Sequence, residues 1–297
     1  MLTILLPTYN SAHRLEACLS SLERQTSKHF RVLVSDNHSS DNTLEVAESF
    51  RKKINDLTII SQGLNIGALG NFALLLESCK TKHFMFLDSE DELSEDYVRN
   101  YYQSIGEDNL ESSIYIPKFF ELGRNLSKRR LLISDRLINF PGRYAFLSAL
   151  NSNSFEGIGH LFYSVFSGSR ARTLFKRVLG TEYSGSLDIS AAWFFLYMFD
   201  SIKFFDGELM HYSIHYSVNE TRHALNNQFI SEQYAHLDYQ TATTALRQFL
   251  DLCKPDLSEQ DFIALKDSLE RFFAAKYSFI QSYQQVRGCL GLPPFLS

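Results

Sequence analysis

The first hundred residues alternate between short apolar runs and segments in which apolar residues recur at helical spacing. The apolar runs are Leu2–Leu6, Arg31–Ser35, Leu57–Ser61 and His83–Leu87. Between them, apolar side chains recur every three or four residues, as on one face of an amphipathic helix. Strands that alternate with helices are typical of βαβ units. We therefore predict an α/β fold with a largely parallel sheet of four strands joined by three crossover helices.

Composition excludes several classes of protein. A chain of 297 residues can bury one large core, or one core with an appendage. With 44% hydrophobic and 21% charged residues, it is neither disordered nor fibrous. The formal net charge of −5 provides no basic field to attract phosphate backbones, so no nucleic-acid partner is expected.

The apolar runs and the cysteines predict a cytoplasmic protein. The longest apolar run, Ala191–Phe199, has nine residues, whereas a membrane-spanning helix needs about 20. The N-terminal residues lack the basic leader and cleavage site of a signal peptide. The four cysteines are scattered without a metal-binding or CxxC spacing, which indicates buried or free thiols in a reducing compartment: Cys18, Cys79, Cys253 and Cys289.

Polar residues follow each of the four predicted strands. These segments are Pro7-Thr8-Tyr9-Asn10, Asp36–Asp41, Asn65-Ile66-Gly67 and Asp88–Glu92. Because the carboxyl ends of parallel strands meet at one edge of the sheet, we expect the four polar tips to form one site.

Acidic residues at this edge predict a divalent cation. Carboxylates that gather from Asp36, Asp88, Glu90 and Asp91 would repel one another unless a cation offset their charge. Hard oxygen ligands suit Mg²⁺ or Mn²⁺, which commonly complete their coordination with substrate phosphates. The alternative, that these residues only begin helices and turns, explains each one singly but not their gathering at one edge. The predicted ligand is a nucleoside diphosphate.

The four tips resemble, in order and spacing, the motifs of family 2 glycosyltransferases. The resemblance rests on Pro7–Asn10, Ser35–Thr43, Asn65-Ile66-Gly67 with Asn71, and Leu87–Asp91, and it covers about the first 100 residues. Within the family, the chain looks most like bacterial enzymes that add sugars to O-antigen or capsule repeat units. The resemblance implies a GT-A fold, a nucleotide-sugar donor, a divalent cation and inversion at the anomeric carbon.

The resemblance also implies roles for individual residues. The donor would be bound by Pro7, Thr8, Tyr9, Asn10, Asp36, Asn65, Gly67, Asn71 and Asp88. The Tyr9 ring would lie against the base and Asp36 would accept its imide proton, which suits UDP or dTDP. The metal ligands would be Asp88 and Glu90, with Asp91 able to share the role.

Glu90 departs from the family pattern, which usually has Asp at this position. One additional methylene moves the carboxylate outward, so a catalytically impaired nucleotide-sugar-binding or scaffolding relative remains an alternative. A nucleotidyltransferase would need a glycine-rich and basic loop after the first strand, and Pro7–Asn10 supplies neither. No phosphate-binding motif of a dehydrogenase or P-loop enzyme follows any strand.

A direct displacement also needs a base to accept the proton of the attacking hydroxyl. In the family this base is an acidic residue at the start of a helix in the second half. The matching position here is Asp188, although the usual Glu-Asp pair appears as Leu187-Asp188. A plain helix N-cap is the alternative role for Asp188, and Glu182 is the reserve candidate for the base.

We expect a GT-A domain over residues 1–225, with a nucleotide-sugar half at about 1–110 and an acceptor half at about 111–225. The elements expected in the second half are a strand at Ser113–Pro117, a polar loop at Arg124–Arg130, helices at Arg143–Leu150 and Leu187–Phe199, and strands at Ile202–Phe205 and Leu209–Tyr216.

Residues 226–297 should form a C-terminal helical region, with two helices separated at Lys254-Pro255-Asp256. The second begins with the capping-box sequence Ser258–Asp261. Its aromatic continuation predicts either an ordinary packed helix or one that rests on the inner face of a membrane. Membrane contact would suit a lipid-linked saccharide acceptor.

Overall fold

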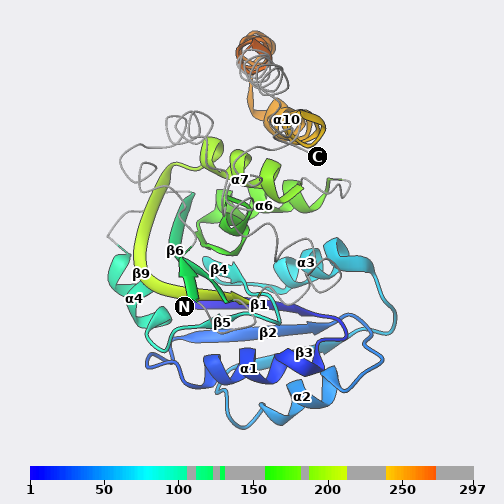
Figure 1. Ribbon diagram of the computed structural model, residues 1–297, viewed down its shortest axis with the longest axis vertical. Coiled ribbons are helices and arrows are strands. Elements are labelled where there is room, and N and C mark those ends of the chain that lie inside the picture. Colours follow the sequence, from blue (N-terminus) through cyan, green and yellow to red (C-terminus); the bar gives the residue numbers. More distant parts are fainter. Residues whose placement is uncertain (106–111, 123–127, 131–157, 182–186, 213–238, 272–297) are drawn as a thin grey trace, which may run out of the picture.

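A computed structural model describes residues 1–105, 112–122, 128–130, 158–181, 187–212 and 239–271. The described residues form a mixed α/β fold around a curled nine-stranded sheet (Figure 1). Its strand order is β3-β2-β1-β4-β8-β6-β9-β5, and β7 pairs with β6. The predicted α/β class is confirmed.

The first half of the chain contains the predicted parallel sheet. Strands β1 (Leu2–Thr8), β2 (Phe30–Asp36), β3 (Leu57–Ser61) and β4 (His83–Phe86) pair in parallel. The crossover helices are α1 (Ala12–Glu23), α2 (Thr43–Ser49) and α3 (Gly67–Ser78). All four strands match the sequence prediction, with ends that differ by at most two residues, and the three helices lie between them as expected.

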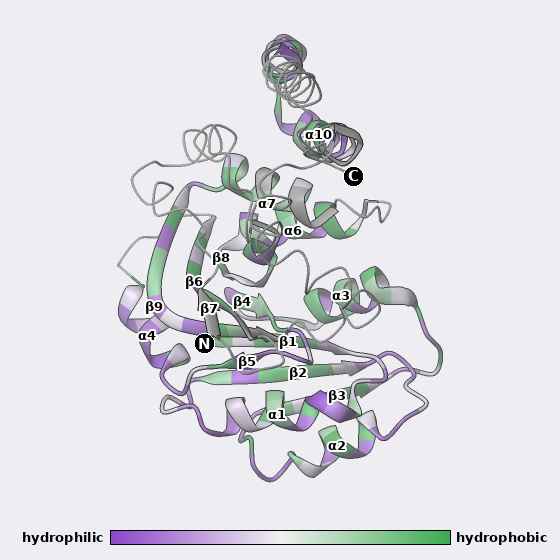
Figure 2. Cartoon of the chain, viewed as in Figure 1, coloured by the Kyte–Doolittle hydropathy of each residue, from purple (hydrophilic) through white to green (hydrophobic). Residues whose placement is uncertain are grey.

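The central strands are buried because helices cover both faces of the sheet. In Figure 1, α1 and α2 lie on one side of β1 and β2, and α3 lies on the other. Ile4, Leu5 and Leu6 of β1 are fully buried, so consecutive residues of this strand enter two separate layers of the core. Figure 2 shows the resulting hydrophobic colour along β1 and β2. Such continuous apolar runs are expected of parallel strands.

The second half adds mostly antiparallel pairings. The first half ends with β5 (Glu92–Leu93) and α4 (Tyr97–Ser104). The elements of the second half are β6 (Ser113–Leu122), β7 (Lys128–Arg130), the 3-10 helix η2 (Ile158–Tyr163), β8 (Val165–Ser167), α6 (Ser169–Leu179), α7 (Leu187–Met198) and β9 (Ser201–Tyr212). The predicted strand at Ser113–Pro117 and helix at Leu187–Phe199 are confirmed. The helix expected at 143–150 lies outside the described residues.

Two predictions for the second half were wrong. Residues 128–130, expected in a polar loop, form β7, because their backbone pairs with Phe120–Leu122 of β6 although all three residues are basic. The strands expected at Ile202–Phe205 and Leu209–Tyr216 are one strand, β9, over its described length. Charged residues suit a short edge strand, which propensity alone does not reveal.

Strand β9 continues as a single strand because a β-bulge absorbs a shift in its pairing register with β6. Ile116 pairs with Phe204 and Lys118 pairs with Glu208, so Pro117 faces three residues of β9. Proline has no N–H to donate to a ladder, which suits a bulge. A Cβ at Gly207 would collide with the rings of Phe205 and Tyr97, so glycine is required there.

The C-terminal helices are joined to the second half. Helix α10 (Tyr239–Cys253) packs against α7, and Arg177 of α6 donates a 2.9 Å hydrogen bond to the Leu252 carbonyl. The short helix η4 (Lys254–Asp256) separates α10 from a helix over residues 259–271, as predicted. Ser258 Oγ accepts the Asp261 N–H at 3.1 Å, which confirms the expected cap. The expected domain boundary near residue 225 lies outside the described residues.

Within the part of the chain that the structure describes, no helix is long and apolar enough to cross a membrane. Three of the cysteines, Cys18, Cys79 and Cys253, are buried free thiols, as expected from their scattered positions. Cys289 lies outside the described residues.

Candidate functional site

The loops after β1 and β2 interlock at the carboxyl edge of the sheet. Asn10 adopts a left-handed backbone conformation (φ 51°), which asparagine tolerates better than most residues. Its backbone N–H donates to Ser39 Oγ at 2.9 Å, and its Oδ1 accepts the Ser40 N–H at 2.9 Å. Asn10, expected to bind the donor, therefore braces one loop against the other.

The loop before α2 also caps the start of α1. The Ser11 N–H donates to Thr43 Oγ1 at 2.8 Å, and the Ala12 N–H donates to Asp41 Oδ2 at 3.1 Å. These side chains satisfy backbone donors that a helix start leaves open. Desolvation by neighbouring groups tends to raise the pKa of Asp41, but hydrogen bonds from Thr43 and Ala12 outweigh it, so the pKa lies below its usual value.

Asp36 and Tyr9 differ sharply in exposure. Asp36 is 3% exposed, and its carboxylate accepts hydrogen bonds from the backbone N–H and the hydroxyl of Ser39. Thr8 is buried as well, and its hydroxyl faces the Ser35 carbonyl at 3.4 Å. Tyr9 is 51% exposed. The edge thus combines a fixed carboxylate with an aromatic ring in contact with solvent.

Asparagine side chains hold the loop after β3. Asn37 Oδ1 accepts the Ile66 N–H at 2.9 Å, and Asn37 Nδ2 donates to Asn65 Oδ1 at 3.1 Å. Gly67 has a φ of 77°, which favours glycine, and a Cβ there would meet nothing within 4 Å. The predicted residues Asn65 and Gly67 therefore come to the edge beside the loop after β2.

Asn71 is buried, and its side chain connects neighbouring segments below the exposed loops of this edge. Its Nδ2 donates to the Ser35 carbonyl at 3.1 Å, and its Oδ1 accepts from Gln62 Nε2 at 2.8 Å. The residue is 2% exposed. These contacts tie the first turns of α3 to the ends of β2 and β3.

The acidic residues after β4 form a compact turn. The Glu90 N–H donates to Asp88 Oδ1 at 3.0 Å, and the Asp91 N–H donates to the Asp88 carbonyl at 3.1 Å. The Glu90 side chain is 13% exposed and lies 3.8 Å from His13 Nε2. Asp91 is fully buried, whereas Asp88 is partly exposed. Asp88 and Glu90 are the two expected metal ligands that retain contact with solvent.

The carboxylates at this edge suit a hard divalent cation only if a substrate supplies further ligands to the ion. No three His, Cys, Asp or Glu side chains among the described residues come together in a group that could hold a metal ion. Mg²⁺ is often bound through one or two carboxylates together with substrate phosphates. The oxygen atoms of Asp88 and Glu90 fit that arrangement.

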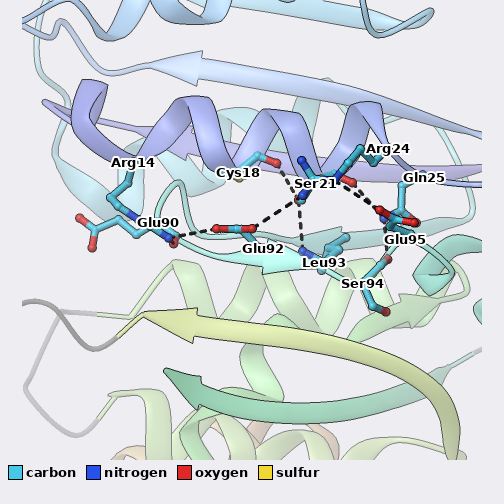
Figure 3. Close-up of polar contacts among 10 residues, drawn as sticks. All are labelled: Arg14, Cys18, Ser21, Arg24, Gln25, Glu90, Glu92, Leu93, Ser94 and Glu95. Atoms are coloured by element: carbon cyan, nitrogen blue, oxygen red, sulfur yellow. Dashed lines mark hydrogen bonds and ion pairs between the residues drawn. The ribbon is translucent and has the colours of Figure 1, made fainter. Parts of the chain in front are cut away.

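Helix α1 lies directly against the acidic turn, as Figure 3 shows for the polar contacts along it. Cys18 Sγ faces the Asp88 carbonyl at 3.6 Å. Burial, together with the charges of Asp91, Asp88 and Glu92, raises the pKa of the Cys18 thiol well above its ordinary value. Cys18 is therefore a neutral packing residue behind the turn.

Asp188 lies in the first turn of α7, which begins at Leu187. Asp188 is therefore the second residue of the helix, whereas an N-cap residue would stand immediately before the first residue. Glu182 lies outside the described residues. The roles of both residues as a base remain predictions.

A cavity of about 650 Å³ lies away from these residues, between α3 and α6. Arg172 lines it, and its guanidinium donates to the backbone carbonyls of Leu76, Cys79 and Thr81. This side chain caps the C-terminal end of α3. The cavity is not part of the acidic edge.

The sequence analysis assigned no donor-binding or metal-binding role to several residues that organise the edge, although four of them lie within the segment Ser35–Thr43 that it named. They hold the loops through side-chain hydrogen bonds: Ser11, Arg14, Asn37, Ser39, Asp41 and Thr43. A usable signal was present, because Ser, Thr, Asn and Asp directly after strands commonly bond to nearby backbone. Sequence alone does not show which loops they join.

Comparisons with known proteins agree with this architecture. The family model described as "Glycosyl transferase family 2" matches residues 3–177. Poly(ribitol-phosphate) beta-glucosyltransferase from Bacillus spizizenii is 27% identical over 106 residues, which are 34% of this chain and 16% of that protein. The match thus spans well under two thirds of that relative's length.

Two solved structures show the same fold. The structure of S. aureus TarS 1–349 has a TM-score of 0.51 and 18% identity, with coverage of 85% of this chain and 71% of the other. GalNAc-T7 with UDP, GalNAc and Mn²⁺ has a TM-score of 0.51 and 11% identity, with coverage of 71% and 44%. The central sheet and its helices therefore have the glycosyltransferase GT-A arrangement.

Proposed function

Because this chain belongs to glycosyl transferase family 2, we propose that it transfers a sugar from a nucleoside-diphosphate donor to a saccharide acceptor. The product would be part of a bacterial surface polysaccharide. UDP and dTDP are the favoured donor nucleotides, and the reaction would invert the anomeric carbon.

The observation that carries this proposal is the meeting of four loops at one edge of the sheet. The exposed ring of Tyr9 provides a surface for a base, and Ser39 fixes the orientation of the Asp36 carboxylate beside it. A carboxylate has about four acceptor positions, so Asp36 has capacity for an imide N–H in addition to Ser39. Asn65 and Gly67 would border the nucleotide.

We propose that Asp88 and Glu90 hold Mn²⁺ or Mg²⁺ together with the donor diphosphate, with Asp91 supporting the turn from behind. The relative GalNAc-T7, whose structure contains UDP and Mn²⁺, lends support to this cofactor. When bound, the ion would neutralise charge that grows on the leaving diphosphate.

Asp188 is our candidate for the base. The acceptor hydroxyl oxygen would form a bond to the anomeric carbon as the bond from that carbon to the diphosphate oxygen breaks. The hydroxyl proton would pass to the Asp188 carboxylate. Its position at the start of α7 supports this role.

We also retain the division into a transferase domain over 1–225 and a helical region over 226–297, and a cytoplasmic location. A lipid-linked acceptor would bring the chain to the inner face of a membrane. Co-sedimentation of the full chain with anionic vesicles tests that contact, and no sedimentation above a protein-free control would contradict it.

The decisive experiment measures release of nucleoside diphosphate from UDP-sugars and dTDP-sugars, with and without Mn²⁺. We expect Mn²⁺-stimulated release that falls at least about 100-fold in Asp88→Asn. Asp206→Asn is the matched control, because this carboxylate is 76% exposed on β9 and pairs with Lys118 away from the edge.

The alternative is a nucleotide-sugar-binding relative without turnover, which the glutamate at position 90 favours. Calorimetry would then detect binding of UDP or dTDP while product release stayed at the level of Asp88→Asn. Absence of both nucleotide binding and product release would contradict both proposals, the transferase and the binding relative.

A further inference from the structure

We propose that Arg14 is a positioning residue, which holds the acidic turn of residues 88–92 in the geometry that binds the metal and the diphosphate. This inference rests on the proposed function. Arg14 belongs to α1, not to any of the polar tips that the family motifs identify.

The contacts of Arg14 reach the middle and the end of the turn (Figure 3). Its guanidinium nitrogen Nη2 donates to Glu92 Oε1 at 3.2 Å and to the Glu90 carbonyl oxygen at 3.4 Å. Glu90 is a proposed metal ligand, so Arg14 holds the backbone from which that side chain extends. The planar guanidinium holds this one donor nitrogen in a fixed orientation, whereas the ammonium of a lysine ends a flexible chain.

Burial distinguishes this ion pair from the others along α1. The Arg14 and Glu92 side chains are 19% and 14% exposed. Arg24 also approaches Glu92, but at 3.9 Å, and its side chain is 50% exposed. Exposed ion pairs contribute little to stability. Removal of one partner from a buried ion pair is costly, because the remaining charge is poorly solvated.

The charges near the turn explain why a cation is needed behind it. Asp88, Asp91 and Glu92 all raise the pKa of Cys18, and Arg14 lowers it, so these four charged groups lie around the same part of α1. Without Arg14, the carboxylates would repel one another and the turn would relax outward.

Helix α1 also joins the two proposed subsites. It begins directly after Tyr9-Asn10-Ser11, and the Ser89 hydroxyl donates to Ser11 Oγ at 2.9 Å. Arg14 lies one turn further along the same helix. It therefore sets the acidic turn relative to the loop that carries Tyr9.

Three variants of the full chain test the inference. Arg14→Met removes the charge and both contacts, and Arg14→Lys retains the charge but not the planar contact. Arg24→Met is the matched control, because it removes a cation near the same Glu92 carboxylate at an exposed position. A fourth variant, Glu92→Gln, removes the charge of the partner but keeps an acceptor oxygen, and provides a further test if Arg14→Met fails to fold.

The measurement is the Kd of UDP by calorimetry, with and without Mn²⁺, alongside kcat and KM for the sugar donor. Loss of a residue that orients a metal ligand commonly weakens metal binding about 10–100-fold. For Arg14→Met we expect Kd to rise about 10-fold with Mn²⁺ and less than about twofold without it. Arg14→Lys and Glu92→Gln should lie between Arg14→Met and the wild type, and Arg24→Met should match the wild type.

A merely structural role would change the melting temperature without this dependence on Mn²⁺. The inference is wrong if Arg14→Met and Arg24→Met shift Kd equally, or if the shift is the same with and without Mn²⁺. If the wild-type chain itself shows no Mn²⁺-dependent binding of UDP or dTDP, the proposed function fails instead.

Discussion

The two ends of the parallel sheet use similar polar bonds for different purposes. At the carboxyl end, side chains from separate loops hold one another and leave Tyr9, Asp88 and Glu90 in contact with solvent. At the amino end of β4, Arg172 caps the carbonyls at the end of α3 and lies over the Phe84 ring at 5.7 Å.

This difference between the two ends predicts which substitutions should lower stability and which should weaken ligand binding. Bonds at the amino end satisfy partly buried backbone groups, so their loss should lower stability and leave donor binding unchanged. Bonds at the carboxyl end hold the proposed donor-binding surface, so their loss should change binding more than global stability.

The largest expected effect is that of Arg172→Met, which should lower the free energy of unfolding by about 2 kcal/mol. The reason is that the carbonyls of Leu76, Cys79 and Thr81 would lose a charged donor. Urea denaturation measures the loss, and the KM for the donor should stay within about twofold.

Lys176→Met is the control for this prediction. Lys176 is one turn further along α6 and pairs with Glu77 at 3.7 Å from a half-exposed position. We expect a change below about 0.5 kcal/mol. Equal losses in the two variants would remove the distinction that we draw for the amino end.

Asn10 tests the carboxyl end. Asn10→Ala should cost about 1–2 kcal/mol, because alanine in a left-handed conformation is strained and the bond to Ser40 is lost. Asn10→Gly relieves the strain but not the lost bond. Both variants should raise the KM for the donor by a similar factor, and unchanged KM values would show that the brace does not serve binding.

The smallest expected effect concerns His83 at the amino end. Burial, the N-terminal ammonium and Lys82 lower its pKa to about 4, and Tyr101 Oη lies 2.8 Å from its Nδ1. The unfolded chain therefore binds the proton first as the pH falls. Stability from neutral His83 is complete above about pH 6.5 and is lost as the pH falls toward 4.

The full shift corresponds to about 3 kcal/mol, but His83 is only half-buried, so we expect about 1 kcal/mol after screening. His83→Gln retains an acceptor for Tyr101 and does not titrate in this range. Urea denaturation at pH 5 and pH 8 should show a smaller difference in this variant than in the wild type. An identical pH dependence in the two proteins would show that groups other than His83 cause the loss of stability at acidic pH.

The sequence predicted the first half of the fold well because its pattern is local. The strands β1 to β4 are short apolar runs, and Leu15, Cys18 and Leu19 of α1 fall on the buried stripe that their spacing predicts. The second half was less predictable, because the continuity of β9 depends on the pairing of Pro117 with a bulge across the sheet. No local pattern contains that information.

At the site, the sequence identified which segments meet but not what each side chain does there. Asn10 and Asn71 match family motifs, yet their amide groups bond to neighbouring loops and strands. Arg14 is the opposite case, since nothing in its local sequence marks it and only the fold brings it to Glu90 and Glu92.

The ladder between β5 and β9 is one of the places where the first and second halves of the chain meet. Glu92 pairs with Met210 and Leu93 with Leu209, and the Ser94 N–H donates to the Glu208 carbonyl at 2.9 Å. These are main-chain bonds, which almost any side chain permits. A different second half could therefore be joined to the same first half only if it also supplied a strand that pairs with β4, an arginine that caps the end of α3, and a glycine at the position of Gly207.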